Sequence, residues 1–311
     1  MTFAFVFPGQ GSQSVGMLQS ISERPEVRVT LQEASEALGE DVAKLIAEGP
    51  AEALSLTTNT QPVMLTAGVA FYRAWLAAGG PAPSVMAGHS LGEYSALVAS
   101  GVISFKDAVP LVRFRAEAMQ TAVPVGTGGM AAILGLDDAA VIQVCAEASA
   151  ASGGVVEAVN FNAPGQVVIA GASDAVTKAC ELLKAAGAKR ALPLPVSAPF
   201  HSSLLQPASE KLKDYLANIE FKAPIIPVIN NVDVEMLNDP IAIKDALVRQ
   251  AAKPVRWQET VQAMAGQGIT HVVECGPGKV LAGLTKRIHD QVTGIPVFDE
   301  ASLNEVLASL K

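Results

Sequence analysis

The pentapeptide glycine-histidine-serine-leucine-glycine at residues 88–92 constrains the possible folds of this 311-residue chain more than any other feature. It follows an apolar run at 85–87 and precedes a helix-compatible stretch at 93–99. This order predicts a strand, a sharp turn and a helix, with glycines near the serine on both sides. Such an arrangement is called a nucleophile elbow, and it exposes the Ser90 Oγ at the end of the strand. The first N–H groups of the helix could then bind a developing oxyanion. The alternative is an ordinary turn in which Ser90 caps the helix.

The chain on both sides of the elbow alternates between apolar runs and amphipathic stretches. We therefore expect an α/β fold with a hydrolase-like α/β body formed by residues 1–124 and 197–311. The expected strands lie at 3–7, 84–88, 225–229 and 271–274, and the expected helices near 60–78, 91–99, 105–121, 204–217, 240–252, 257–267 and 279–290.

Residues 125–196 have a different pattern, which begins after a glycine-rich stretch at 126–129. A strand at 131–136 leads to a helix opened by Asp137 and Asp138, two strands at 155–160 and 166–170, a helix after Ser173, and a strand at 190–195. The order βαββαβ is that of a ferredoxin-like module, so we expect a small domain inserted into the body. The cleft between the two is the expected ligand site.

Composition excludes several classes of function. The net charge of −8 argues against nucleic-acid binding and requires local cations for an anionic substrate. No apolar run approaches the roughly 18 residues that span a bilayer, and residues 1–7 lack the basic start of a signal peptide. Three widely spaced cysteines suggest free thiols, and the four histidines show no metal-binding spacing, so we expect a cytoplasmic protein without metal or membrane association.

A serine nucleophile needs a base, and His201 is the best candidate because it lies in a proline-containing loop where the chain re-enters the body. A solvent-exposed loop histidine is the alternative. No acidic residue between Ser90 and His201 is an obvious third member, so an amide or a backbone carbonyl could orient the histidine instead. Arg113 and Arg115, in the expected 105–121 helix, are either surface residues or a guanidinium fork for a substrate carboxylate.

Eight ordered motifs give the chain a resemblance to a known family. The chain resembles the bacterial malonyl-CoA:acyl carrier protein transacylases, which are related to the acyltransferase domains of polyketide and fatty acid synthases. The motifs are FPGQGSQ at 7–13, GHSLGE at 88–93, RFRAEAM at 113–119, VNFNAPGQVVIAG at 159–171, PFH at 199–201, NNVD at 230–233, LVRQ at 247–250 and GPGKVL at 276–281.

The resemblance implies a role for each matching residue, and no catalytic position departs from the family's pattern. By it, Ser90 is the acylated nucleophile, His201 its base and Gln250 the residue whose backbone carbonyl orients the histidine. The backbone N–H groups of Gln10 and Leu91 would form the oxyanion hole. The remaining expected substrate contacts are Arg115, which would pair with the malonyl carboxylate, and His89, Asn160 and Phe200, which would shape the pocket.

The implied activity is malonyl transfer from malonyl-CoA to the phosphopantetheine thiol of holo acyl carrier protein, feeding fatty acid elongation through a malonyl-serine intermediate. No cofactor is expected beyond these substrate-borne groups. Two alternatives stay open at this point, namely a serine thioesterase or hydrolase and a non-catalytic carrier-docking module. Lys279, Lys286 and Arg287 are candidate contacts for an acidic carrier, although solvated helix surface is the simpler interpretation.

Overall fold

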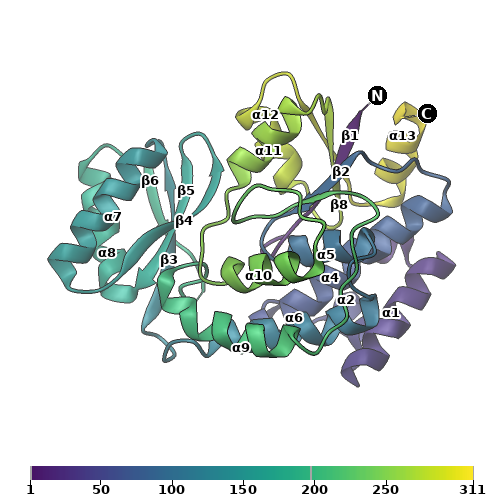
Figure 1. The fold of residues 1–311 in the computed structure, drawn as a ribbon, viewed down its shortest axis with the longest axis horizontal. Helices are drawn as coiled ribbons and strands as arrows, with labels where there is room; N and C mark the ends of the chain where they lie inside the picture. The colour runs from purple at the N-terminus through teal and green to yellow at the C-terminus, as the bar shows by residue number, and fades with distance from the viewer. Residues whose placement is uncertain (1, 197, 311) are drawn as a thin grey trace.

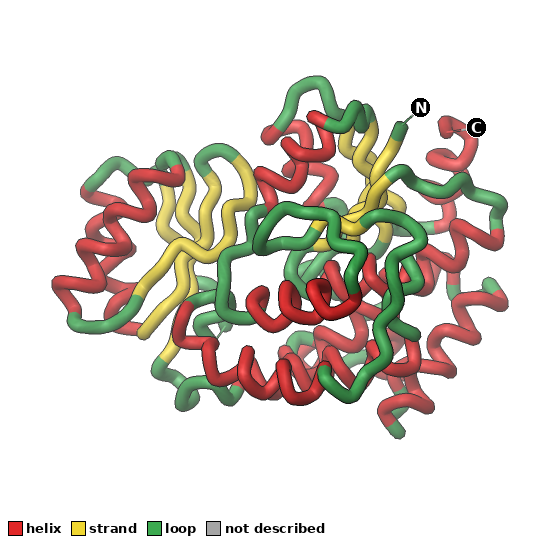
Figure 2. Tube along the Cα trace, in the orientation of Figure 1, coloured by secondary structure: helices red, strands yellow, loops and turns green. Residues whose placement is uncertain are grey.

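The computed structural model describes residues 2–196 and 198–310. Residue 197, at which the expected body resumes, lies outside the described residues, as do both terminal residues. Two sheets dominate the structure, and the smaller one stands apart with its two helices on the left of Figure 1. The tube view shows that long loops connect the helices in the part of the chain nearest the viewer (Figure 2).

The larger sheet has five strands in the order β7-β2-β1-β8-β9, and every neighbouring pair is parallel. Its strands are β1 (Phe3–Phe7), β2 (Val85–Gly88), β7 (Val228–Ile229), β8 (His271–Cys275) and β9 (Thr293–Val297).

Helices cover both faces of this sheet, so its central strands are buried, and β1 and β2 are apolar on both sides. The phenylalanines of β1 pack on one face with the aromatic residues of α4, whereas Ala4 and Val6 pack on the other face with α11 and α12. The helices around the sheet are α1 (Pro25–Leu38), α2 (Val42–Glu48), α3 (Ala51–Leu54), α4 (Thr57–Ala77), α5 (Gly92–Ala99), α6 (Phe105–Gln120), α9 (Gln206–Leu216), α10 (Pro240–Gln250), α11 (Trp257–Gly266), α12 (Val280–Ile288) and α13 (Glu300–Leu310), with short 3-10 turns at Gln19–Ile21 and Ser203–Leu205.

The smaller sheet is antiparallel, with the order β4-β5-β3-β6. It is built from β3 (Gly128–Leu134), α7 (Asp138–Ser152), β4 (Val156–Ala163), β5 (Gln166–Ala172), α8 (Ser173–Ala185) and β6 (Arg190–Pro193). This is the expected βαββαβ order. Together the two sheets confirm the α/β fold class with a ferredoxin-like module.

Two parts of the body were not expected from the sequence. Strand β9 contains Gly294 and Pro296, which are unfavourable in a central strand, but β9 lies at the edge of the sheet, where proline is tolerated. Helices α1 to α3 and α13 were also missed, although α1 begins with Pro25 and is followed by Gly39 at a φ of 66°, both ordinary helix-end signals.

The parallel strands bring distant segments to one edge. The chain leaves β1 at Pro8 and β2 at His89, and neighbouring parallel strands end on the same side of the sheet. A Cβ on Gly92 would lie 2.0 Å from the Phe7 backbone oxygen, so glycine is needed where α5 starts against β1. The loops that carry Gln10 and Ser90 therefore lie beside each other.

The smaller sheet is joined to the body through backbone hydrogen bonds. The Phe161 N–H donates to the Val255 carbonyl at 3.0 Å, and the Val255 N–H donates to the Val159 carbonyl at 2.8 Å. This bridge fixes the intervening Asn160 against the body. Over the described ranges, no helix is long and apolar enough to cross a membrane. The cysteines are free thiols, two of them buried and Cys180 partly exposed.

Candidate active site

The turn after β2 has the geometry of a nucleophile elbow. Ser90 has a φ of 51°, in the left-handed region that non-glycine residues rarely adopt. A Cβ on Gly88 would lie 1.8 Å from a backbone atom of Gly92, so the first glycine is required by the close approach of the turn to α5. The expected strand, turn and helix are all present at the expected positions.

Ser90, His201 and Gln250 form a hydrogen-bonded chain. The Ser90 Oγ lies 2.7 Å from the His201 Nε2, and the His201 Nδ1 lies 2.7 Å from the backbone oxygen of Gln250. Because a carbonyl can only accept, the Nδ1 carries the proton and the Nε2 is free to accept one from serine. The missing acid of a triad is therefore replaced by a backbone carbonyl at the end of α10.

Burial keeps the histidine uncharged. His201 is 3% exposed, and burial, assisted by the nearby Arg115 guanidinium, lowers its pKa from 6.5 to about 3. Neutral imidazole is the form that can act as a base.

Arg115 lies directly beside the nucleophile. It is 1% exposed, and its guanidinium donates to the side-chain oxygens of Gln61 and Gln250 at 2.8 Å each and to the Ser90 Oγ at 3.1 Å. Burial lowers its pKa, which nearby Tyr94 and Glu93 oppose. In the part of the chain that the structure describes, no carboxylate forms an ion pair with Arg115 and its Nε has no acceptor. A buried cation that contacts only neutral groups is suited to receive an anion.

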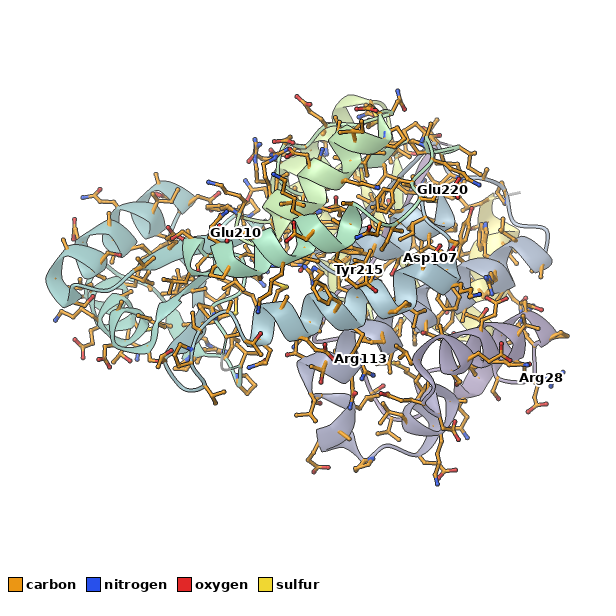
Figure 3. All side chains as sticks on the ribbon, turned by 60° about the horizontal axis from the view of Figure 1, so that its bottom comes forward. Arg28, Asp107, Arg113, Glu210, Tyr215 and Glu220 are labelled. Carbon is orange, nitrogen blue, oxygen red and sulfur yellow. The ribbon has the colours of Figure 1, made fainter. Side chains whose placement is uncertain are left out.

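The neighbouring Arg113 lies on the same helix, but it is half-buried and pairs with a carboxylate. Its guanidinium donates to both oxygens of Glu40, at 2.8 and 2.9 Å, and it lies on the side of α6 that faces the purple N-terminal helices (Figure 3). The residues alone left the two arginines as equivalent candidates, and the structure places only Arg115, the one that the resemblance implied, beside Ser90.

The backbone N–H groups near the nucleophile differ in whether they already donate a hydrogen bond. The Ser90 N–H donates to the Asn231 Oδ1 at 2.8 Å. The N–H groups of Leu91 and Gln10 donate no hydrogen bond within residues 2–196 and 198–310, and both residues line the cavity at Ser90. Two unused donors beside the nucleophile are the components that an oxyanion hole requires.

The three remaining predicted residues also line this cavity. The His89 Nε2 lies 2.8 Å from the Asn162 Oδ1 and its ring packs against Trp257 at 5.6 Å, so this residue is tied into the elbow's packing. Phe200 is 9% exposed beside His201. The Asn160 Oδ1 is buried without a partner among the described residues.

The cavity has a volume of about 140 Å³ and takes its lining from both sheets. The body contributes the nucleophile, base and arginine, and the smaller sheet and its flanking loops contribute one wall. The wall residues are Met130, Asn160, Leu194 and Val196.

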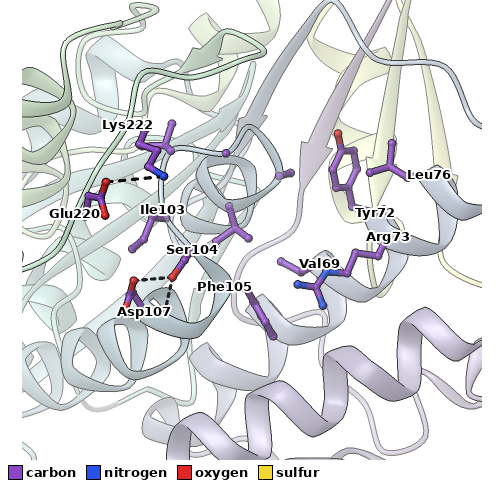
Figure 4. A pocket seen from close by; sticks show the side chains of 14 residues that line it. Val69, Tyr72, Arg73, Leu76, Ile103, Ser104, Phe105, Asp107, Glu220 and Lys222 are labelled. Atoms are coloured by element: carbon purple, nitrogen blue, oxygen red, sulfur yellow. Dashed lines mark hydrogen bonds and ion pairs between the residues drawn. The ribbon is translucent and has the colours of Figure 1, made fainter.

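A larger cavity, of about 360 Å³, lies between α4 and the start of α6 (Figure 4). Its serine and its charged side chains already have partners: Ser104 bonds Asp107 at 2.6 Å at the start of α6, Lys222 lies 3.8 Å from Glu220, and Arg73 pairs with Glu33. None of these groups forms an activated nucleophile, so the smaller cavity is the candidate active site.

Three residues of the site were not found from the sequence. Gln61 is a buried polar residue in the apolar helix α4, a signal that the sequence did offer. Glu93 and Asn231 are buried and hydrogen-bonded to each other, but they are 138 positions apart and no spacing rule connects them. Among the described residues, no cluster of three or more histidine, cysteine or carboxylate side chains could hold a metal ion.

Comparisons with known proteins agree over nearly the whole chain. Residues 4–304 match the acyl transferase domain family. The malonyl CoA-acyl carrier protein transacylase of Escherichia coli strain K12 is 58% identical over 306 residues, which are 98% of each chain.

Solved structures are similarly close. The acyl-carrier-protein S-malonyltransferase of Burkholderia pseudomallei 1710b is 70% identical with a TM-score of 0.97, over 99% of this chain and 100% of that one. A malonyl-transacylase solved in complex with its type II polyketide acyl-carrier protein is 52% identical, also with a TM-score of 0.97 and the same coverage.

Proposed function

The chain belongs to the acyl transferase domain family, and we propose that it transfers the malonyl group from malonyl-CoA to the phosphopantetheine thiol of acyl carrier protein. The names of its relatives support this activity across nearly the full length of the chain. The product serves fatty acid elongation.

The observation that carries the proposal is the position of Arg115. A buried guanidinium without an ion-pair partner among the described residues lies 3.1 Å from the Ser90 Oγ. An acyl group whose far end is a carboxylate can pair with this arginine while its thioester carbonyl faces the serine. Malonyl has this form, whereas acetyl and simple fatty acyl groups have no carboxylate.

In the first half-reaction the Ser90 Oγ attacks the thioester carbonyl and its proton passes to the His201 Nε2. The N–H groups of Leu91 and Gln10 hold the oxyanion of the tetrahedral intermediate. The intermediate collapses, CoA leaves as the thiol after taking the proton back from His201, and a malonyl-serine ester remains.

In the second half-reaction the phosphopantetheine thiol of the carrier attacks this ester. The same histidine accepts the thiol proton and returns it to the Ser90 Oγ. The enclosing wall from the smaller sheet limits the entry of water, which would otherwise hydrolyse the ester. The cycle uses only side chains and substrate-borne groups, so we propose that it needs no cofactor, and that it takes place in the cytoplasm.

The nucleophile assignment is tested with Ser90→Ala. This variant should gain no mass on incubation with malonyl-CoA, because alanine cannot form the ester, whereas the wild type should gain one malonyl group and lose it on addition of holo carrier protein. His201→Ala should acylate more slowly by about 10²- to 10⁴-fold. Intact mass measures all three proteins, and a malonyl adduct on Ser90→Ala would refute the assignment. Discharge of the wild-type adduct by water as fast as by carrier would indicate a hydrolase instead.

A further inference from the structure

The sequence motif at 230–233 has no part in the mechanism above, yet one of its residues reaches the elbow. Asn231 is fully buried just after β7. Its side-chain oxygen accepts from the Ser90 N–H at 2.8 Å, and its amide nitrogen donates to the Gly88 carbonyl at 2.7 Å. One planar amide thus binds the backbone on both sides of His89.

The side-chain amide of Asn231 continues the hydrogen bonding between β7 and β2 beyond the last paired residues. Strand β7 pairs with β2 at Met86 and Ala87, and the turn begins shortly afterwards. There the Asn231 amide supplies one donor and one acceptor, which are the groups that a further pair of strand residues would provide. Ser90, held at a φ of 51°, needs such support because this backbone conformation is disfavoured for serine.

The same residue is linked to the base. The Glu93 Oε2 accepts from the Asn231 backbone N–H at 3.0 Å and from the Gln250 Nε2 at 2.8 Å. The Gln250 Nε2 also donates to the Ser90 carbonyl at 3.0 Å, and the Gln250 backbone oxygen orients His201. A single buried network therefore connects the backbone of the nucleophile to the residue that holds the histidine.

We propose that Asn231 is a positioning residue for acyl transfer. Its amide fixes the backbone of Ser90 so that the Oγ stays within hydrogen-bonding distance of His201. It also occupies the Ser90 N–H, which leaves the Leu91 N–H as the elbow's donor to the oxyanion. The proposal rests on the acyl-transfer function given above.

The chain offers a matched control for the test. Asn230 is also buried, at 5% exposure, and its side chain makes three hydrogen bonds, but all of them stay within its own loop, to Val232, Asp233 and Glu235. Asn231→Ala should slow acylation by malonyl-CoA by about 10²-fold, as a misplaced nucleophile does, without weakening CoA binding. Asn230→Ala should lower the melting temperature and leave the acylation rate unchanged.

A near-isosteric variant covers the case in which Asn231→Ala does not fold. In Asn231→Asp, only the protonated carboxyl can both accept from the Ser90 N–H and donate to the Gly88 carbonyl. The new carboxyl would face Glu93 on α5, whose own pKa burial raises to about 7, with Asp233 on its own loop and Arg115 on α6 as the nearby charges. Burial lowers the pKa of both nearby histidines, His89 and His201. The ratio of its acylation rate to that of the wild type should fall with rising pH, by about tenfold per unit once this carboxyl ionises.

Acylation is measured by rapid quench and intact mass, with CoA binding by calorimetry, over pH 5 to 8. A pH-dependent ratio for Asn231→Asp, with a pH-independent ratio for Asn230→Ala, supports the positioning role. A pH-independent ratio for Asn231→Asp, or equal slowing by alanine at 230 and 231, overturns it. A wild type that never forms an acyl-enzyme would instead refute the proposed function itself.

Discussion

At the scale of single residues, the burial of Arg115 costs free energy and also prepares the site for a substrate carboxylate. A buried guanidinium is expensive unless its charge is compensated, and here its contacts within the described chain are amide oxygens, a serine hydroxyl and the face of Tyr94. A substrate carboxylate would supply the missing charge. The arginine therefore links substrate choice to the chemistry, because the group that reads the carboxylate also touches the nucleophile.

Replacing Arg115 with alanine should change which acyl groups are accepted. Loss of one member of a buried charged pair typically costs about 2–5 kcal/mol, so malonyl transfer should fall roughly 30- to several-thousand-fold. Acetyl transfer should change little, because acetyl has no carboxylate to leave unpaired. The measurement is kcat/KM for malonyl-CoA and acetyl-CoA, and equal losses with both would show that Arg115 is structural.

A lysine at the same position provides the matched comparison. Arg115→Lys keeps the charge but cannot bond Gln61, Gln250 and the substrate through one planar fork, so it should recover only part of the malonyl activity. In the same assay methylmalonyl-CoA should be a poor substrate, because the buried Phe200 crowds the cavity beside His201.

The pKa of His201 predicts an unusual pH dependence. Burial lowers this pKa to about 3, so the base stays neutral in the folded enzyme, and acylation should persist as the pH falls from 7 to 5. The unfolded chain has a histidine pKa near 6.5 and takes up the proton first, so this residue should reduce stability as the pH falls below 6.5. An activity midpoint near 6.5 would contradict the prediction.

Glu93 is the necessary control for that profile. Burial raises its pKa to about 7, above its unfolded value of 4.5, so its contribution to stability is present below pH 4.5 and is lost as the pH rises toward 7. Glu93→Gln removes this titration. The acid side of the acylation profile should remain flat in this variant if His201 alone sets it.

Among the residues of the site, the sequence alone predicts those that lie in turns marked by glycine or proline. Ser90 is flanked by glycines and His201 follows a proline loop, and both signals are local. Gln10, Leu91, Arg115 and Gln250 were assigned by family resemblance, and their catalytic roles remain predictions that the proposed variants test. Glu93 and Asn231 could not be predicted, because only the folded sheet brings them together.

At the scale of elements, the candidate contacts for the carrier lie at helix α12, with Lys279 just before its first residue and Lys286 and Arg287 in its last turn. Lys279 and Lys286 are exposed and line the same shallow cavity. Arg287 is exposed too, but its guanidinium donates to the Gln166 side chain at the start of β5 and to the Pro164 carbonyl in the turn before it. Arg287 therefore differs from the two lysines, because it also has a structural contact.

Lys286→Glu is consequently the cleaner test of docking. It should raise the KM for carrier protein and leave the rate of acylation by malonyl-CoA unchanged, because acylation does not involve the carrier. Arg287→Glu should affect both half-reactions, since it also breaks a contact between α12 and the smaller sheet. Separate assays of the two half-reactions measure this, and an unchanged carrier KM for Lys286→Glu would remove this face from the docking surface.

The elements that the sequence predicted well are those with clear periodicity or strong end signals. The order of elements in the antiparallel module was predicted correctly because helices with acidic starts separate its strands, although β3 begins at Gly128 and not at the expected residue 131. Strand β9 was missed because Gly294 and Pro296 interrupt its apolar pattern, and only its place at the edge of the sheet makes it stable. Local propensity cannot show which strand will lie at an edge.

At the scale of the whole molecule, the site depends on how the smaller sheet is held against the body. The backbone bridge at Val255 fixes Asn160, and a second contact joins β4 to the loop that carries His201. Glu157 on β4 accepts from the Ser203 N–H at 2.7 Å and from its Oγ at 2.9 Å, two residues beyond His201. His201 itself has a φ of 65°, so its loop is held in a disfavoured conformation by its contacts.

Removing the Glu157 contact should therefore act on catalysis more than on the fold. Because the pair is partly exposed, Glu157→Ala should cost about 1 kcal/mol of stability or less. The freed loop should misplace the imidazole and slow acylation by up to about tenfold, with the affinity for malonyl-CoA unchanged. Glu147→Ala is the control, since Glu147 is an exposed residue of α7 whose side chain bonds Gln143 on the same helix. Thermal melts, calorimetric binding and quenched acylation assays compare the two, and equal acylation rates would show that the body alone positions His201.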